Sequence, residues 1–304
     1  MLVIRDQQMQ VFKDNAKKQF EAETIRHISR FAPKQYEILG EKTIGQIVRK
    51  GVERAEKHGF TNRGPVRFFV ELMFMLGSDF DTDPQYPWVA EILGGSNQFE
   101  LQRPEATDSG SEPATDESDQ VPHEQPQAGA LKSKPALVNS PPDQMTRAGQ
   151  LYQKAMRYIE MAAGTELEYE REALYRIVGP TPVAFKFPGD DTSGISAFFR
   201  KVYPQKCDYI GDSALEELVR RGISSAAAFS RSAKAAVIFA GLMLIFGHGC
   251  LSDPQFPWIA NTLEKDAPGD VNTRIEHLWS KTRIYLENAL KELEGRAQNA
   301  PEWM

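Results

Sequence analysis

The stretch Leu72-Met-Phe-Met-Leu-Gly-Ser-Asp-Phe-Asp-Thr-Asp-Pro-Gln-Tyr-Pro-Trp-Val-Ala-Glu-Ile-Leu93 decides the fold, because the chain contains a second version of it. That version is Leu242-Met-Leu-Ile-Phe-Gly-His-Gly-Cys-Leu-Ser-Asp-Pro-Gln-Phe-Pro-Trp-Ile-Ala-Asn-Thr-Leu263. The two are identical at 10 of 22 positions and align without a gap from Leu72 on Leu242 to Leu93 on Leu263. Each joins an apolar segment ending in glycine to an Asp-Pro-Gln turn and a tryptophan, so the sequence predicts a duplicated unit.

The duplication continues upstream with the periodicity of a helix. Two sets of six small or aliphatic residues follow the spacing i, i+3, i+4, i+7, i+8, i+11 of one helix face. The first set is Ile44, Ile47, Val48, Gly51, Val52 and Ala55, and the second is Leu215, Leu218, Val219, Gly222, Ile223 and Ala226. Glycine inside a helix costs about 1 kcal/mol relative to alanine. Gly51 and Gly222 therefore predict that another helix comes close at these positions.

Composition indicates a soluble, globular protein, and the helical periodicity of the repeated segments predicts the all-α class. The 304 residues are 41% hydrophobic and 26% charged, which is enough for two ordinary domains. The longest apolar run, 235–247, is shorter than the roughly 20 residues that span a bilayer. The N-terminus has no secretory leader pattern, and two cysteines are too few for a disulfide framework. We expect a cytoplasmic protein that does not enter a membrane.

The predicted organisation is two homologous helical bundles joined by a flexible linker. Residues 1–95 form the first module, 96–142 the linker, and 143–304 the second module with extra N- and C-terminal helices. The linker is rich in proline and polar residues and has almost no aliphatic periodicity, which predicts disorder. It also carries a net charge of −5 out of the chain's −6. The remainder is nearly neutral, so we expect no nucleic-acid partner.

Helix boundaries follow from capping residues and breakers. We expect a first helix from about Arg5 to Phe31, ended by Pro33, and further helices at about 41–57 and 66–76. After the linker, Asp143 can cap one helix, and Thr165 with Glu168 forms a capping-box pattern for another that ends near Val178. A final helix is expected over about 271–293.

Aromatic residues at the repeated turn are candidates for binding a partner. Trp88 and Trp258 would lie beside the glycine that ends each apolar helix, where plugging the helical core is the favoured interpretation and anchoring another protein is the alternative. Trp279 on the final helix is open to the same two interpretations. The candidate partner-binding residues are Tyr86, Trp88, Phe256, Trp258 and Trp279.

No pattern of catalytic or metal-binding residues stands out. Asp79, Asp81 and Asp83 alternate like the start of a calcium loop, but the required glycine and distal glutamate are missing. His248 and Cys250 could form a nucleophile and a base, yet no third group that would orient them is identifiable. We therefore expect no catalytic residue, no metal, no cofactor and no enzymatic activity.

Several features together resemble a known group of proteins. They are the long amphipathic first helix, Val48-Arg-x-Gly51, Leu72-Met-x3-Gly77 and Asp83-Pro-x-x-Pro-Trp88. The pattern resembles small all-helical bacterial proteins encoded beside type VI secretion effectors, their spike-tip proteins and their loading chaperones. It covers Met1 to Leu93 and Phe198 to Leu263, while the tandem form with an acidic linker departs from the single-unit version.

The resemblance implies an accessory role with another protein as the partner. The leading hypothesis is a protein-interaction module that acts as a co-chaperone for a secreted effector or its adaptor, with both modules engaging one client across the linker. An immunity protein that neutralises a cognate toxin is the first alternative. A hydrolase that uses the Asp79–Asp83 carboxylates, or the His248 and Cys250 pair, is the second.

Overall fold

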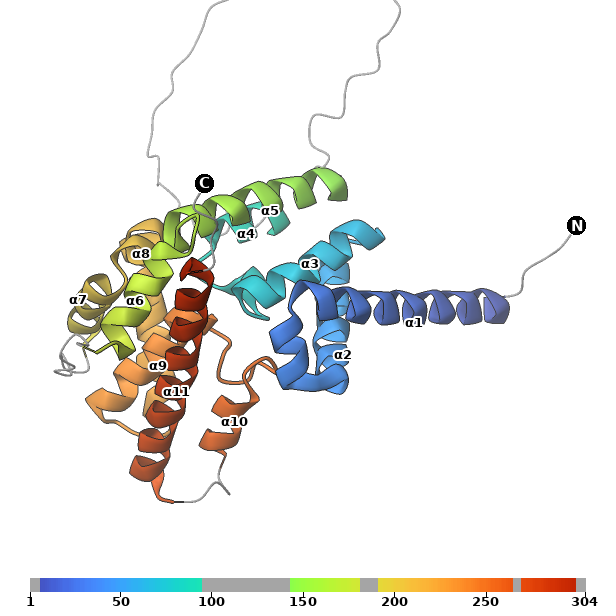
Figure 1. Cartoon of the computed structure of the whole chain (residues 1–304). Helices are drawn as coiled ribbons and strands as arrows, with labels where there is room; N and C mark the ends of the chain where they lie inside the picture. The colour runs from blue at the N-terminus through green and yellow to red at the C-terminus, as the bar shows by residue number, and fades with distance from the viewer. Residues whose placement is uncertain (1–5, 95–142, 181–190, 265–268, 299–304) are drawn as a thin grey trace, which may run out of the picture.

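The computed structural model describes residues 6–94, 143–180, 191–264 and 269–298, and within them the chain is all helical (Figure 1). These residues form eleven α-helices, one 3-10 turn and one π-helical turn, without a strand. The expected all-α class is confirmed for this part of the chain. The predicted linker, residues 96–142, lies outside the described residues.

The N-terminal residues form a series of helices that meet at sharp corners. The elements are α1 (Asp6–Phe31), α2 (Pro33–Lys57), α3 (Arg63–Leu76), η1 (Phe80–Thr82) and α4 (Pro87–Gly94). Pro33 stands in the first turn of α2, where its missing N–H costs nothing. The helix therefore begins before the expected residue 41, and Gly40 kinks it with φ 72° and ψ 161°.

A second series repeats these corners. Its elements are α7 (Thr192–Val202), α8 (Pro204–Ala227), α9 (Ala233–Phe246) and α10 (Pro257–Leu263). Tyr203 before α8 has φ −135° and ψ 68°, against −129° and 64° for Ala32 before α2. Gly211 kinks α8 with φ 79° and ψ 169°, as Gly40 kinks α2. At these two corners, equivalent residues of the two series thus have nearly the same backbone geometry.

The remaining elements are α5 (Gln144–Tyr158), the π-helical turn η4 (Ile159–Ala163), α6 (Glu168–Val178) and α11 (Val271–Gln298). Asp143 caps α5 as expected, because its carboxylate accepts hydrogen bonds from the amides of Met145 and Thr146. The capping box predicted at Thr165 is wrong. The N-cap of α6 is Leu167, at φ 58°, and the Glu168 carboxylate accepts the amide of Glu166 instead.

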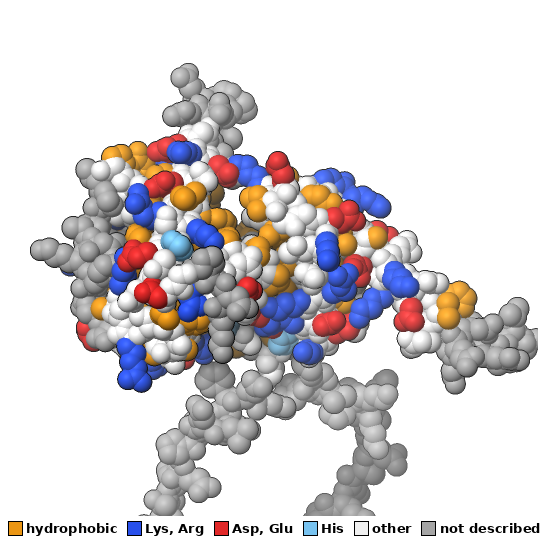
Figure 2. Space-filling model, turned by 90° about the horizontal axis from the view of Figure 1, so that it is seen from below, with side chains coloured by type: hydrophobic (Ala, Val, Ile, Leu, Met, Phe, Trp, Pro, Cys, Tyr) orange, Lys and Arg blue, Asp and Glu red, His pale blue; other side chains and the backbone are white. Residues whose placement is uncertain are grey.

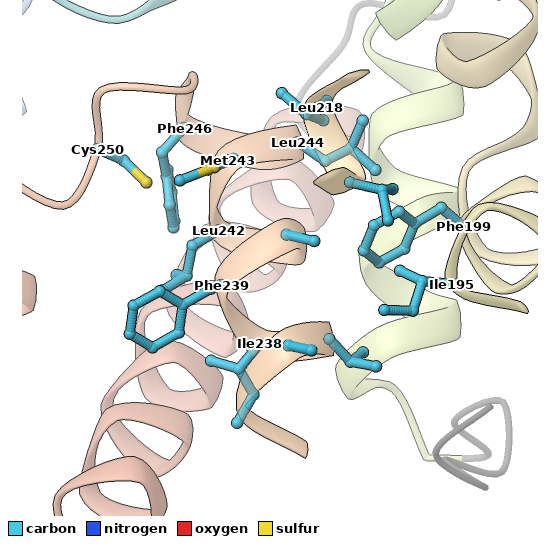
Figure 3. Close-up of a cluster of buried hydrophobic side chains, with 14 of the residues drawn as sticks. Ile195, Phe199, Leu218, Ile238, Phe239, Leu242, Met243, Leu244, Phe246 and Cys250 are labelled. Atoms are coloured by element: carbon cyan, nitrogen blue, oxygen red, sulfur yellow. The ribbon is translucent and has the colours of Figure 1, made fainter. Parts of the chain in front are cut away.

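Buried side chains form two main cores. The first core gathers apolar residues of α1 to α4, and the second core those of α6 to α11. Figure 3 shows part of the second core, with Phe199 of α7 and Leu218 of α8 beside apolar side chains of α9. Leu151, Ala155 and Tyr158 of α5 belong to the first core. In Figure 1, α5 lies beside α3 and α4. The expected second module, 143–304, therefore contains a helix that packs in the other core, because its apolar stripe meets α3 and α4.

Both internal glycines lie at close helix crossings, as predicted. A Cβ on Gly51 would stand 2.7 Å from Cγ2 of Val70 and 2.8 Å from Sδ of Met73. A Cβ on Gly222 would stand 2.5 Å from Cα of Ala240. Because Ala240 presents backbone at that point, the α8–α9 crossing leaves less room for a side chain than the α2–α3 crossing does. Within the described residues, no helix has the length and apolar character to cross a bilayer.

Candidate functional site

The two Asp-Pro-Gln turns cross and hold each other. Oδ1 of Asp83 accepts the amide of Gln85 within its own turn, at 2.9 Å, while its Oδ2 accepts the amide of His248 from the other turn, at 2.7 Å. Asp253 mirrors this arrangement. Its carboxylate accepts the amide of Gln255 at 2.9 Å and, from the first turn, the amide of Ser78 at 2.9 Å. Each aspartate therefore caps its own turn and binds the opposite one.

The glutamines repeat the exchange. Nε2 of Gln85 donates to the carbonyl oxygen of Met243 at 3.1 Å, and Nε2 of Gln255 donates to that of Met73 at 2.7 Å. Both acceptors lie in the last turn of an apolar helix, and each also accepts the amide of the glycine that ends its helix, Gly77 or Gly247, at 3.0 Å. Each turn therefore stabilises the end of the other turn's helix, and the four bonds relate the halves by an approximate two-fold axis.

Two glycines allow the backbones to cross. Gly77 and Gly247 have φ values of 99° and 93°, which L side chains rarely adopt. A Cβ on Gly77 would stand 2.8 Å from the carbonyl oxygen of Phe246, and one on Gly247 would stand 3.1 Å from that of Leu76. The space between the turns is filled and has no room for a water molecule. The crossing is therefore a packed joint and not a cleft.

An ion-pair network flanks the joint on the first turn only. Lys50 and Arg54 lie on one face of α2, His58 follows directly after the helix, and all three meet Asp79 or Asp81. Nε2 of His58 lies 2.8 Å from Oδ2 of Asp81, and the Arg54 guanidinium binds both carboxylates. Burial alone would raise the pKa of Asp81, but hydrogen bonds from His58 and Arg54 lower it overall.

The second turn lacks this network. Ser225 and Phe229 stand in the places of Arg54 and His58, and Gly249 and Leu251 replace the two aspartates. Gly249 leaves room for the partner turn, since a Cβ there would stand 2.2 Å from Oδ2 of Asp79. The hydrogen bonds of the joint are therefore the same on both sides, whereas the ion pairs lie on the side of the first turn. Among the described residues, no group of histidine, cysteine and carboxylate side chains is arranged to hold a metal ion.

The expected partner-binding residues lie in two environments. Tyr86 and Trp88 are buried, with 3% and 6% of their surface exposed, whereas Phe256, Trp258 and Trp279 are half-buried. Tyr86 contacts Tyr158 of α5 edge-on, with ring centroids 5.1 Å apart. Burial raises its pKa well above the usual range. The first pair therefore packs inside the protein, and the second turn keeps its aromatic rings nearer the surface.

Helices α5 and α11 also share a sequence pattern. Their equivalent residues are separated by a different number of positions from those of the two turns. The shared pattern is Asp-x-x-Thr-Arg, followed by leucine, lysine and tyrosine at equal spacings. It matches Asp143, Thr146, Arg147, Leu151, Lys154 and Tyr158 with Asp270, Thr273, Arg274, Leu278, Lys281 and Tyr285. Both aspartates accept the amide of the threonine three residues later. Tyr285 contacts Trp258 and Phe256 as Tyr158 contacts Tyr86.

His248 and Cys250 differ in their surroundings. Cys250 is 1% exposed, and burial raises the pKa of its thiol well above the usual range. The thiol therefore stays protonated at neutral pH. Nδ1 of His248 lies 3.3 Å from Oδ2 of Asp83, and its Nε2 lies 3.5 Å from the hydroxyl of Thr82. The imidazole thus belongs to the joint.

A surface groove of about 430 Å³ lies between α1 and α2. Charged side chains of both signs line it, together with Ile25 and Tyr36. On the face seen in Figure 2, positive and negative side chains are likewise interspersed and form no continuous field of one sign.

Comparisons with protein-family models, curated proteins and solved structures return no match for this chain.

Proposed function

We propose that the chain is a non-enzymatic protein-interaction protein built from two homologous helical modules. Module 1 comprises residues 6–94 with 143–163, and module 2 comprises 165–298. The matching corners at Gly40 and Gly211 and the repeated α5 and α11 pattern support this division. In this division, the predicted linker lies between α4 and α5 of module 1. The equivalent connection in module 2, between α10 and α11, is short and contains residues 265–268.

The observation that carries the functional proposal is the use made of the repeated turn. Its conspicuous polar residues bind the opposite turn, through Asp83 and Asp253, or the helix before that turn, through Gln85 and Gln255. The space between the turns has no room for a substrate. The most characteristic motif thus supports a joint between modules. The helix faces outside the joint are then what the protein can offer to another molecule, and helix faces suit protein partners.

The partner class comes from the resemblance to proteins encoded beside type VI secretion effectors. We propose a cytoplasmic accessory or co-chaperone role for a secreted effector or its adaptor. The interspersed charges seen in Figure 2 support a protein partner, because phosphate backbones bind to basic faces.

The test is co-purification of the full chain with each product of its neighbouring genes, expressed pairwise. We expect one effector or adaptor to remain bound through size-exclusion chromatography at a fixed stoichiometry. Asp208→Ala on the exposed side of α8 is a control that leaves the complex unchanged. Retention of none of these products contradicts the proposal. Rescue of toxin-expressing cells at a one-to-one level would assign the immunity role instead.

A further inference from the structure

The two modules differ in how one equivalent surface is covered. In module 2, α6 lies beside α7 and α11 (Figure 1). Leu174 of α6 belongs to the second core together with Val237 and Ile238 of α9. Ile177 of α6 lines a small residual cavity of about 40 Å³ with Ile245 of α9 and other apolar side chains. Helix α6 therefore closes the surface formed by α7, α9 and α11.

The corresponding surface of module 1 is open. It consists of the last turns of α1, one face of α3 and the start of α5, and no described helix lies across it. Phe31, Met75 and Tyr152 are 42%, 37% and 53% exposed. They occupy the places of Val202, Ile245 and Trp279 in module 2. Helix α1 instead continues straight, and its N-terminal half projects from the body (Figure 1).

These side chains form one continuous band, defined by Phe31, His27, Glu71, Phe68, Met75 and Tyr152. The ring of His27 stacks on Phe31 at 5.9 Å, and its Nε2 lies 2.7 Å from Glu71 of α3. Phe68 and Met75 lie on either side of Glu71 on the same face of α3, at the spacing of successive helical turns. Phe68 in turn contacts Tyr152 of α5, with ring centroids 6.0 Å apart.

We infer that this band is a docking site for an amphipathic helix of a partner protein, which would lie where α6 lies in module 2. The apolar face of α6 supplies Tyr169, Ala173, Leu174 and Ile177, and the partner helix needs the same spacing of small, aliphatic and aromatic residues. This inference rests on the proposed function, since it names the surface and the kind of partner that an interaction protein would use.

One substitution between the modules adds charge to the site. Arg67 of α3 stands where Val237, 1% exposed, stands in α9. The Arg67 side chain is exposed and makes no ion pair with a described residue. A helix that docks here therefore binds best with a carboxylate opposite Arg67. Helix α6 itself carries three glutamates, at 168, 170 and 172, so its own sequence is a suitable probe.

The test uses the full chain and a fluorescent peptide of residues 165–180, with binding followed by anisotropy. We expect saturable 1:1 binding with a Kd of about 10–100 μM, typical of a short helix that orders on binding. Tyr152→Glu and Met75→Glu should each weaken it at least about tenfold, and Arg67→Glu several-fold. Ile284→Glu is the matched control, because Ile284 is also an exposed apolar residue but lies on α11, and this variant should bind the peptide normally.

Three results with the peptide would overturn the inference. They are no binding up to about 1 mM peptide, equal binding by a scrambled peptide, and binding unaffected by Tyr152→Glu, which would mean that the peptide displaces α6 from module 2. A wild-type dimer that Tyr152→Glu dissociates would make a second copy the occupant, which also contradicts a partner helix. None of these outcomes decides the proposed function, because the co-purification test does not use the peptide.

Discussion

The carboxylate of Asp83 accepts a hydrogen bond from the backbone amide of His248, 2.7 Å away and 165 residues later in the chain. Asp253 makes the reciprocal bond to the amide of Ser78 at 2.9 Å. The turns therefore tie the two cores together directly. The sequence leaves open whether its two repeats pack on each other, and here they do, because each aspartate is shared between its own turn and the opposite one.

Replacing Asp253 should loosen this joint. In Asp253→Ala, the amide and the hydroxyl of Ser78 lose their buried acceptor, as does the amide of Gln255. A buried donor left without a partner costs about 1–3 kcal/mol, so we expect the free energy of unfolding to fall by about 3 kcal/mol. Urea denaturation measures this. Asp208→Ala, at an exposed aspartate, should change stability by less than about 0.5 kcal/mol.

The α8–α9 crossing predicts an unusual response to alanine. A glycine-to-alanine change inside a helix ordinarily stabilises by up to about 1 kcal/mol. Gly149→Ala in α5 should do so, because no atom lies within 4 Å of the added Cβ. Gly222→Ala should instead destabilise by about 1–3 kcal/mol, since its Cβ meets the backbone of Ala240. Thermal melting compares the two, and equal shifts would contradict the crossing.

The ion-pair network predicts a stability change on the acid side. The pKa of Asp81 is lowered in the folded protein, so the folded state binds fewer protons than the unfolded state near pH 4. The stabilisation by Asp81 is therefore complete above the unfolded pKa and is lost as pH falls through the folded pKa. Asp81→Asn should be less stable than wild type at pH 6, and the difference should shrink towards pH 2. Urea midpoints across this range check it.

Thiol reactivity tests the nucleophile alternative. Burial raises the pKa of Cys207 to about 11 and that of Cys250 well above its usual value. Only the thiolate reacts rapidly with Ellman's reagent. We expect neither thiol to react within minutes in the native protein at pH 8, and both to react in guanidinium chloride. Fast labelling of native Cys250 would revive a catalytic role for the pair with His248.

Cutting the chain between α4 and α5 should not separate the pieces. A protease site inserted within residues 96–142 and cleaved after folding leaves Leu151, Ala155 and Tyr158 buried in the first core. The crossed turns hold the same pieces together. The nicked protein should elute at the volume of the intact chain and dissociate only in denaturant. By contrast, residues 1–95 expressed alone should aggregate, because they lack α5.

The sequence predicts much of this fold from local signals. Proline, glycine and apolar periodicity place most helices, and the internal glycines predict the crossings at Gly51 and Gly222. The contact of Asp83 and Asp253 with the opposite turn could not be predicted, because a repeated motif does not show whether its side chains bind their own copy or the other one. The match between α5 and α11 is hidden for a physical reason. The segment 95–142 between α4 and α5 is far longer than the 265–268 connection, so this match falls out of register with that of the turns.

The charge network could have been found from spacing. Lys50, Arg54 and His58 recur every four residues along one helix face, and the second copy loses most of this stripe together with the two aspartates. Asp79 and Asp81 alternate like calcium ligands, but their partners are these basic side chains. Their contact depends on how the first turn folds back on α2, which is a tertiary property.

The place where residues 95–142 leave and rejoin the described structure has a practical consequence. Gly94 ends α4 and Asp143 begins α5, and both helices belong to the first core. A reporter such as a fluorescent protein, spliced between them, would enter and exit one body without lengthening any connection between the two cores. The position offers a way to label the protein inside a living cell while both ends of the chain and the crossed turns keep their native sequence.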